Sequence, residues 1–305
     1  MKLLLTGDWH LRFKRPEMRL DENYFETQAG KVGQILEIAQ KNECGAILQP
    51  GDFFDSVETP WFVVQYYMRM LIDTLFDKSV DSIGVGVPGV VDTKSGIVYD
   101  LVNIPSWKKV HLKERLEDHF GCPVFINNDA NCFAVGEKYF GKARNFSNIV
   151  GLITGTGLGA GIIVNNSLYN GSNCGAGEFG MIAYKDRNYE YYCSGQFFRE
   201  IHKIDGADLF RRAENGDGSA LEIFRQYGYH IGQLITTILY AIDPEIIIFG
   251  GSVSKSFPFY IDEMRKVIRD FPYSSVRENI IIDVSETVNI AVLGAAALCY
   301  NIDVK

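Results

Sequence analysis

The sequence predicts an α/β protein built of two lobes or two domains, and three observations support that class. The chain has 305 residues, of which 47% are hydrophobic, so it can bury more core than one small module contains. Short apolar runs of strand length alternate with stretches whose apolar residues recur at helical spacing. Glycines cluster between these runs, which is typical of α/β proteins with functional loops.

The first part of the chain is expected to form a βαβα arrangement. Its elements are a strand at Lys2–Thr6, a helix at Thr27–Lys41, a strand at Gly45–Leu48 and a helix from Thr59 towards Phe76. Each strand ends in a polar loop, Gly7-Asp8-Trp9-His10 after the first and Gln49-Pro50-Gly51-Asp52 after the second. Loops at strand ends are common places for chemistry.

The remainder is expected to alternate strands with helices. Strands are expected at Ser82–Val87, Pro123–Ile126, Ile149–Thr154, Ala160–Val164, Glu245–Phe249 and Ile280–Val284. Helices are expected at Leu112–Phe120, from the asparagines at 127–131 to Tyr139, and at Gln196–His202, Ser219–Ala241 and Ala291–Asn301. The irregular, aromatic stretch from Gly171 to Gly195 is typical of a substrate loop.

Composition narrows the classes of function. The sequence has no apolar run long enough for a membrane span, and Met1 to Leu11 is too polar for a signal peptide, so a cytoplasmic protein is expected. A formal net charge of −8 argues against nucleic acid as the main partner. The six cysteines form no close pairs, so neither a disulfide framework nor a CxxC metal knuckle is indicated.

A glycine-rich loop is expected between the strands that end at Thr154 and begin at Ala160. It contains the residues Thr154, Gly155, Thr156, Gly157 and Gly159. Such glycines let backbone amides approach a phosphate without obstruction by Cβ atoms, and the threonine hydroxyls add donors. A tight hairpin without a ligand explains the same glycines. The loop resembles neither a Rossmann turn nor a P-loop, because a strand follows it and the P-loop lysine is absent.

Asp129 stands where a strand gives way to a helix, among Asn127, Asn128 and Asn131. A carboxylate at such a junction can act as the general base that accepts a proton from a sugar hydroxyl attacking a phosphoryl group. An ordinary helix N-cap is the alternative interpretation. Asn103 and Trp107 are further candidates for contact with a sugar, although turn and core roles explain them equally well.

Six motifs in one order resemble the ROK family of repressors and sugar kinases, over about residues 73 to 305. They are Val85–Asp92, Asn103, Asn128-Asp129-Ala130-Asn131, Gly155–Gly161, Gly177-Glu178-Phe179-Gly180 and Phe249-Gly250-Gly251-Ser252. The resemblance implies an actin-like, ribonuclease-H-like ATPase fold, with Asp129 as catalytic base and a homodimeric assembly. It further implies that Gly155, Thr156 and Gly157 bind the phosphates of ATP with Mg²⁺, that Gly250 and Gly251 flank the adenosine, and that Asn103, Asn128 and Glu178 contact the sugar.

The sequence departs from the family at three places. The family's zinc-binding histidine and three cysteines align with Met181, Tyr189, Tyr191 and Gln196, so no structural zinc is expected. A glutamate that contacts the sugar in the family aligns with Phe198. The Asp-x-Gly-Gly-Thr loop, which opens ROK kinases and holds the phosphates and magnesium, has no counterpart in this sequence.

Residues 1 to about 71 instead resemble the first two motifs of calcineurin-like metallophosphoesterases, closest to DNA-repair exonuclease subunits. Asp8, His10 and Asp52 would be the metal ligands, with Mn²⁺ as a suitable ion. The later histidine motifs of that superfamily are missing. We therefore expect a chimera, in which a metallophosphoesterase-like segment 1–72 replaces the first lobe strands of a ROK body at 73–305.

The leading hypothesis from the sequence is an ATP-dependent sugar kinase, weakened by the missing first phosphate loop. The first alternative is a metal-dependent phosphoesterase or DNA exonuclease that uses the N-terminal motifs. The second is a sugar-sensing ROK regulator without enzymatic activity.

Overall fold

The computed structural model describes residues 2–5, 24–41, 44–48, 81–99 and 108–300. The chain divides into two compact units, Met1–Ser82 with Asp100–Lys108 and Ile83–Tyr99 with Lys109–Lys305. Several expected features lie outside the described residues: Asp8, His10, Asp52, Asn103 and the helix from Thr59. The domain boundary expected near residue 72 stays a prediction.

The described part of the first unit is a βαβ arrangement. Strand β1 (Lys2–Leu5) pairs in parallel with β2 (Cys44–Leu48), and α1 (Tyr24–Lys41) connects them in sequence. Helix α1 buries Ala29, Val32 and Leu36, which are spaced three and four residues apart on one helix face. The first three elements expected from the sequence are therefore confirmed.

A five-stranded sheet organises the second unit. Its strand order is β10-β9-β8-β13-β14. The strands are β8 (Ile149–Thr154), β9 (Leu158–Val164), β10 (Ser167–Leu168), β13 (Ile246–Gly250) and β14 (Ile281–Val284). Strand β13 is parallel to both β8 and β14, whereas β8 and β9 form an antiparallel hairpin.

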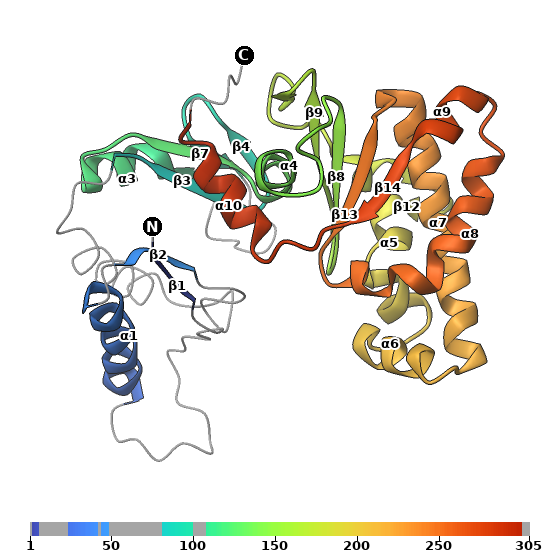
Figure 1. The fold of residues 1–305 in the computed structure, drawn as a ribbon, viewed down its shortest axis with the longest axis horizontal. Coiled ribbons are helices and arrows are strands. Elements are labelled where there is room, and N and C mark those ends of the chain that lie inside the picture. Colours follow the sequence, from blue (N-terminus) through green and yellow to red (C-terminus); the bar gives the residue numbers. More distant parts are fainter. Residues whose placement is uncertain (1, 6–23, 42–43, 49–80, 100–107, 301–305) are drawn as a thin grey trace. The chain divides into compact units, whose positions relative to one another are not determined.

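Helices cover both faces of this sheet (Figure 1). Helices α4 (Asp129–Phe140) and α10 (Ile290–Ala297) lie on one face, and α5 (Tyr189–Cys193), α7 (Gly218–Ile242) and α8 (Phe257–Arg269) lie on the other. Side chains of β13 alternate between the two cores: Ile246 and Ile248 pack with α4 and α10, and Ile247 and Phe249 pack with α7 and α8. Burial on both faces explains the unbroken apolar run of this strand.

A second parallel pair leads to the candidate site. Strand β3 (Ile83–Val87) pairs with β7 (Val124–Asn128). Beside them, β4 (Val90–Asp92), β5 (Ile97–Tyr99) and β6 (Lys109–His111) form an antiparallel sheet, and α3 (Leu112–Phe120) follows β6. The Asp92 carboxylate accepts a hydrogen bond from the Lys94 amide at 3.0 Å and so shapes the turn between β4 and β5.

Short elements complete the second unit. They are η1 (Phe179–Met181), β11 (Ala183–Tyr184), β12 (Arg187–Asn188), the π-helical turn η2 (Phe197–Ile201), α6 (Gly206–Glu214), η3 (Val253–Ser256) and α9 (Ser274–Asn279). The segment from Gly171 to Gly195, which was expected to be irregular, thus contains four short regular elements.

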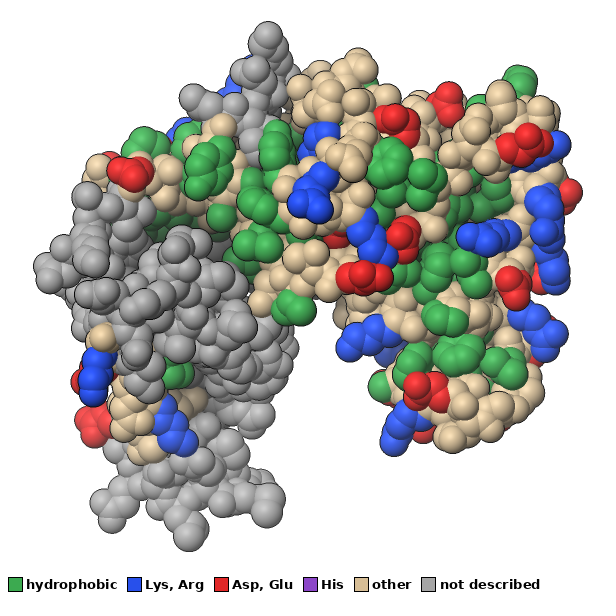
Figure 2. Space-filling model, viewed as in Figure 1, with side chains coloured by type: hydrophobic (Ala, Val, Ile, Leu, Met, Phe, Trp, Pro, Cys, Tyr) green, Lys and Arg blue, Asp and Glu red, His purple; other side chains and the backbone are tan. Residues whose placement is uncertain are grey.

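The structure confirms most of the expected elements and adds four α-helices, α5, α6, α8 and α9. Helix α3 and strand β8 have the expected bounds. In α8, Tyr260, Met264 and Ile268 recur every fourth residue and are buried. The exposed residues between them are largely charged, and Figure 2 shows basic side chains over this part of the molecule. An apolar stripe with charged residues on the other face is the pattern of an amphipathic surface helix, so the sequence itself contains the signal for α8.

Candidate active site

Asn128 and Asp129 meet at the junction of β7 with α4. Asn128 is the N-cap: its side-chain oxygen accepts from the amides of Ala130 at 2.8 Å and Asn131 at 3.4 Å. Its side-chain nitrogen donates to the Gly89 carbonyl at 3.0 Å. Because Asn128 takes the cap, Asp129 becomes the first helical residue. The N-cap alternative for Asp129 is therefore wrong.

The Asp129 carboxyl is exposed, yet the surrounding protein removes part of its hydration. This desolvation raises the pKa of Asp129, and the hydrogen bond from the Ala130 amide only partly opposes it. Desolvation also raises the pKa of Glu178, and the negative charges of Glu190 and Asp129 raise it further. Asp129 and Glu178, expected from separate motifs, thus lie close enough to interact electrostatically.

The glycine loop is a tight turn between β8 and β9. The Gly155 amide donates to the Gly157 carbonyl at 3.0 Å, and Thr154 already pairs with Leu158 across the hairpin. Gly159 lies within β9. Thr154 is fully buried and its hydroxyl donates to the Gly250 carbonyl at 3.3 Å, so of the two threonines only Thr156 has an exposed side chain.

The two predicted nucleotide-binding motifs meet at one edge of the five-stranded sheet. Ile153 of β8 pairs with Gly250 of β13, and Gly251 follows directly. Because β8 and β13 are parallel, their carboxyl ends point the same way and carry the Gly155 turn and the Gly250 loop side by side. This is the usual position of ligand sites in α/β sheets.

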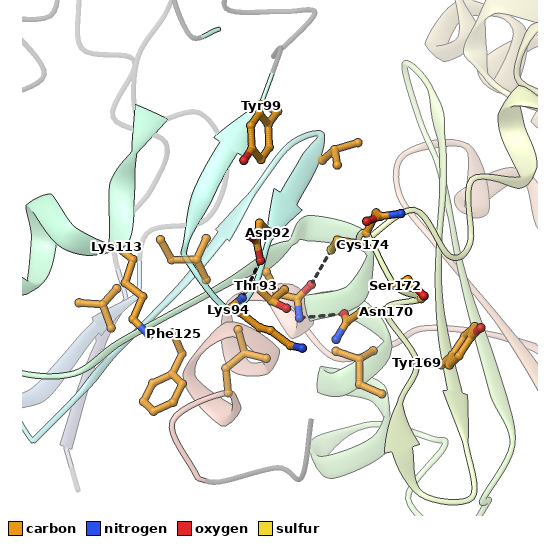
Figure 3. A pocket seen from close by; sticks show the side chains of 18 residues that line it. Asp92, Thr93, Lys94, Tyr99, Lys113, Phe125, Tyr169, Asn170, Ser172 and Cys174 are labelled. Carbon is orange, nitrogen blue, oxygen red and sulfur yellow. Dashed lines mark hydrogen bonds between the residues drawn. The ribbon is translucent and has the colours of Figure 1, made fainter. Parts of the chain in front are cut away.

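A cavity of about 1040 Å³ with a mixed polar and apolar lining lies beside the end of β7 (Figure 3). Figure 3 shows Asp92, Thr93 and Lys94 near Asn170 and Cys174, with Tyr99 and Tyr169 further out. The lining residues are Val90, Asp92, Thr93, Lys94, Tyr99, Lys113, Val124, Phe125, Ile126, Asn127, Leu168, Tyr169, Asn170, Gly171, Ser172, Asn173, Cys174 and Leu298. The cavity combines amides, hydroxyls and aromatic rings, a mixture that suits a polyhydroxylated ligand.

A buried network of asparagines joins this cavity to the junction. The Asn127 amide nitrogen donates to the Asn170 side-chain oxygen at 3.1 Å, and the Asn131 nitrogen donates to the side-chain oxygens of Asn127 at 2.9 Å and Asn170 at 3.1 Å. The Cys174 thiol lies 3.8 Å from the Asn127 oxygen. Cys174 lies in the stretch from Gly171 that was expected to be a substrate loop, but neither Asn170 nor Cys174 was expected to contact the junction, because only the tertiary fold brings their loop to α4.

The side chains at the four positions aligned with the family's zinc ligands have other partners or are exposed. Met181 is 55% exposed, whereas Tyr189 is buried and hydrogen-bonds to Thr237 at 2.8 Å. The Gln196 amide nitrogen donates to Glu190 at 3.1 Å, and Arg187 lies over the Tyr191 ring. Thioether, phenol and amide groups with these separate partners do not fit a tetrahedral zinc site.

Two further observations concern the described residues only. Among them, no group of three or more histidine, cysteine, aspartate or glutamate side chains could hold a metal ion. None of their helices is long and apolar enough to cross a membrane.

Solved structures identify the class of fold. A ROK family glucokinase from Streptomyces griseus, in complex with glucose and AMPPNP, superposes with a TM-score of 0.66 at 27% identity, covering 79% of this chain and 88% of that one. The ROK hexokinase from Thermus thermophilus has the same TM-score at 22% identity, covering 80% of this chain and 87% of that one. The chain therefore has the two-lobed actin-like, ribonuclease-H-like α/β fold.

The family follows from the sequence comparison. Residues 58–302 match the model of the ROK family, and the chain belongs to that family. Among its relatives, the xylose repressor of Bacillus subtilis is 30% identical, over 64% of this chain and 54% of the repressor. The glucokinase of Thermotoga maritima is 28% identical, over 76% of this chain and 84% of the glucokinase. The chain thus spans about half the length of the repressor and most of the glucokinase.

Proposed function

We propose that the chain is an ATP-dependent sugar kinase in which Asp129 acts as the general base. The observation that carries this proposal is the Asp129 carboxyl itself, exposed at the start of α4 with a raised pKa and with Glu178 nearby. A raised pKa makes the ionised carboxylate a stronger base towards a hydroxyl proton. Similarity to glucokinases supports the choice of reaction.

The other described residues have separate tasks in this proposal. One N–H of the Asn128 amide donates to Gly89, which leaves its second N–H for a sugar hydroxyl. Gly155, Thr156 and Gly157 form the phosphate site. The Gly155 amide stays bonded to the Gly157 carbonyl and keeps the turn closed, whereas the backbone amides of Thr156 and Gly157 and the Thr156 hydroxyl bind phosphate oxygens. Gly250 and Gly251 flank the adenosine. Mg²⁺ would neutralise phosphate charge when bound with ATP. The described residues contain no cluster of three or more histidine, cysteine, aspartate or glutamate side chains that could hold a metal ion, so no step is assigned to Mg²⁺.

The decisive test is a coupled ADP-release assay with a panel of hexoses and N-acetylhexosamines, run on the wild type and Asp129→Asn. We expect Asp129→Asn to lower kcat by about 100-fold or more, the usual contribution of a general base. Asp262→Asn changes an exposed carboxylate on α8 and serves as the matched control, with unchanged turnover expected. Full activity in Asp129→Asn would remove this residue from the mechanism.

A second candidate is a sugar-sensing regulator, favoured by the similarity to the xylose repressor. In that case calorimetry would detect sugar binding while ADP release stayed at background with every sugar. A homodimer is proposed for either function, and light scattering on the purified chain would measure its mass.

The N-terminal phosphoesterase and the chimeric origin stay proposals, because Asp8, His10 and Asp52 lie outside the described residues. Manganese-dependent hydrolysis of bis-p-nitrophenyl phosphate that disappears in Asp52→Ala would support the phosphoesterase. An absence of such hydrolysis in the wild type would end this proposal.

A further inference from the structure

Glu190 touches the glycine turn directly. It lies in the first turn of α5, and its Oε2 accepts a hydrogen bond from the Leu158 amide at 3.0 Å. Its other oxygen, Oε1, accepts from the Gln196 side-chain nitrogen at 3.1 Å. Both carboxylate oxygens are therefore used, one on the glycine turn and one within the segment that carries Glu190.

The fit between Glu190 and the turn is close. A Cβ at Gly157 would lie 2.7 Å from the Glu190 Oε2, so any larger residue at position 157 would push the carboxylate away. The same segment holds the other end of the turn, because the Gly195 amide donates to the Gly155 carbonyl at 2.7 Å. Residues 190–196 therefore form hydrogen bonds at both ends of the turn Gly155–Gly157.

These contacts occur where the zinc-binding segment of the family aligns. Gln196 stands at the position of one cysteine ligand, and Glu190 lies between the positions of two others, Tyr189 and Tyr191. Tyr189, Tyr192 and Cys193 anchor this segment in the core, and Glu190 adds the side-chain hydrogen bond that reaches the turn itself. The charged Glu190 carboxylate accepts two hydrogen bonds, and hydrogen bonds to a charged acceptor are stronger than those between neutral groups.

We infer that Glu190, oriented by Gln196, is a positioning residue that fixes the glycine turn for nucleotide phosphates in a chain that works without structural zinc. The nucleotide part of this inference rests on the proposed kinase function. The structural part of the inference, that Glu190 holds the turn in place, does not depend on the proposed kinase function.

The test compares Glu190→Ala, which removes both hydrogen bonds, with Glu190→Gln, which keeps an acceptor for the Leu158 amide while Gln196 reorients its amide. Hydrogen exchange of the Leu158 amide is measured on the free proteins. We expect the Leu158 amide to exchange roughly tenfold faster or more in Glu190→Ala, because that factor corresponds to the loss of one hydrogen bond to a charged group. In Glu190→Gln, exchange should stay near the wild-type rate. Gln196→Ala should give a smaller increase.

A second measurement is the Kd for Mg-AMPPNP by calorimetry. Glu190→Ala should weaken binding by about the factor seen in exchange, whereas Glu190→Gln should bind no more weakly than the wild type. Glu222→Ala, which removes an exposed carboxylate of α7 paired with Arg225, is the control and should alter neither measurement. Metal analysis should find no stoichiometric zinc, and a chelator should leave the wild-type Tm unchanged.

Unchanged Leu158 exchange in Glu190→Ala would overturn the positioning role. Stoichiometric zinc, or a Tm that falls with chelator, would overturn the independence from zinc. If the wild type binds no nucleotide, the proposed kinase function fails, while the exchange data still decide the role of Glu190. If Glu190→Ala does not fold, Gln196→Ala decides instead, and wild-type exchange in that variant counts against the inference.

Discussion

Asp129 combines solvent exposure at the first position of α4 with a pKa that desolvation raises. The helix N-terminus and the Ala130 amide favour the ionised form, but desolvation outweighs them. The residue therefore protonates at a higher pH than an ordinary aspartate.

This position predicts the pH dependence of the proposed kinase. A general base acts only when ionised, so kcat/KM should fall as the pH drops through the raised pKa of Asp129, above the value of about 3.9 of a free aspartate. A pH–rate profile of kcat/KM measures this limb. A rate that stays flat down to about pH 4 would contradict the assignment.

His230 is a second residue whose titration is predictable. Burial on α7 and, to a smaller extent, the nearby charge of Lys185 together lower the pKa of His230 to about 4. Its Nδ1 lies 3.0 Å from the Tyr184 hydroxyl, and the unprotonated Nδ1 of a neutral histidine can accept a hydrogen bond from that hydroxyl.

Because the folded-state pKa of His230 is depressed, its contribution to stability is complete above the unfolded-state value of about 6.5 and is lost as the pH falls towards 4. The Tm of the wild type should therefore drop over this window. His230→Gln keeps a hydrogen-bond partner for Tyr184 but cannot titrate, so its Tm should drop less. Equal slopes for the two proteins would show that other groups cause the acid sensitivity.

At the scale of elements, α4 and α10 make the tightest packing described in the second unit. Gly294 of α10 faces the backbone of α4, where a Cβ would lie 1.7 Å from the Cys132 carbonyl oxygen. Only glycine allows this approach of two helices whose apolar faces build one of the two cores.

Gly294→Ala should therefore destabilise the fold by about 1–3 kcal/mol or more, because the helices must separate to admit a methyl group. Urea denaturation followed by circular dichroism measures the loss. Gly218→Ala is the control, because a Cβ at this position of α7 would have no atom within 4 Å, and its free energy of unfolding should be close to that of the wild type. A Gly294→Ala protein as stable as the wild type would mean that α10 packs less closely than described.

The sequence predicted elements well where one local pattern decides the structure, as in the buried run of β13 and the turn-bounded helix α3. It predicted the strand-to-helix junction at Asp129 and the glycine turn between two strands, because short motifs carry them. It did not predict the burial of Thr154 or the network of Asn127, Asn170 and Cys174. Those features depend on β13 and on the loop after β10, which meet the site only through the tertiary fold.

For the whole molecule, the open choice is between a kinase and a sensor, since relatives of both kinds share the family. A ligand that binds only the folded state raises stability by mass action, by about 2.7 kcal/mol at one hundred times its Kd. A kinase should gain Tm from Mg-AMPPNP and from its sugar, whereas a sensor should gain it from sugar alone. Thermal unfolding with each ligand, and with both together, separates the two cases, and no shift with either would count against both.

Asn128 does two things at once, since its oxygen caps α4 and its nitrogen reaches Gly89. Few other side chains can replace it: aspartate would keep the cap but donate no hydrogen bond, and serine would keep the cap but is too short to reach Gly89. In the proposed kinase, where the second N–H of Asn128 binds a sugar hydroxyl, one side chain would serve both the local fold and recognition of the acceptor. If position 128 were randomised, selection for stability and selection for function should each recover asparagine, and few other residues should pass both selections.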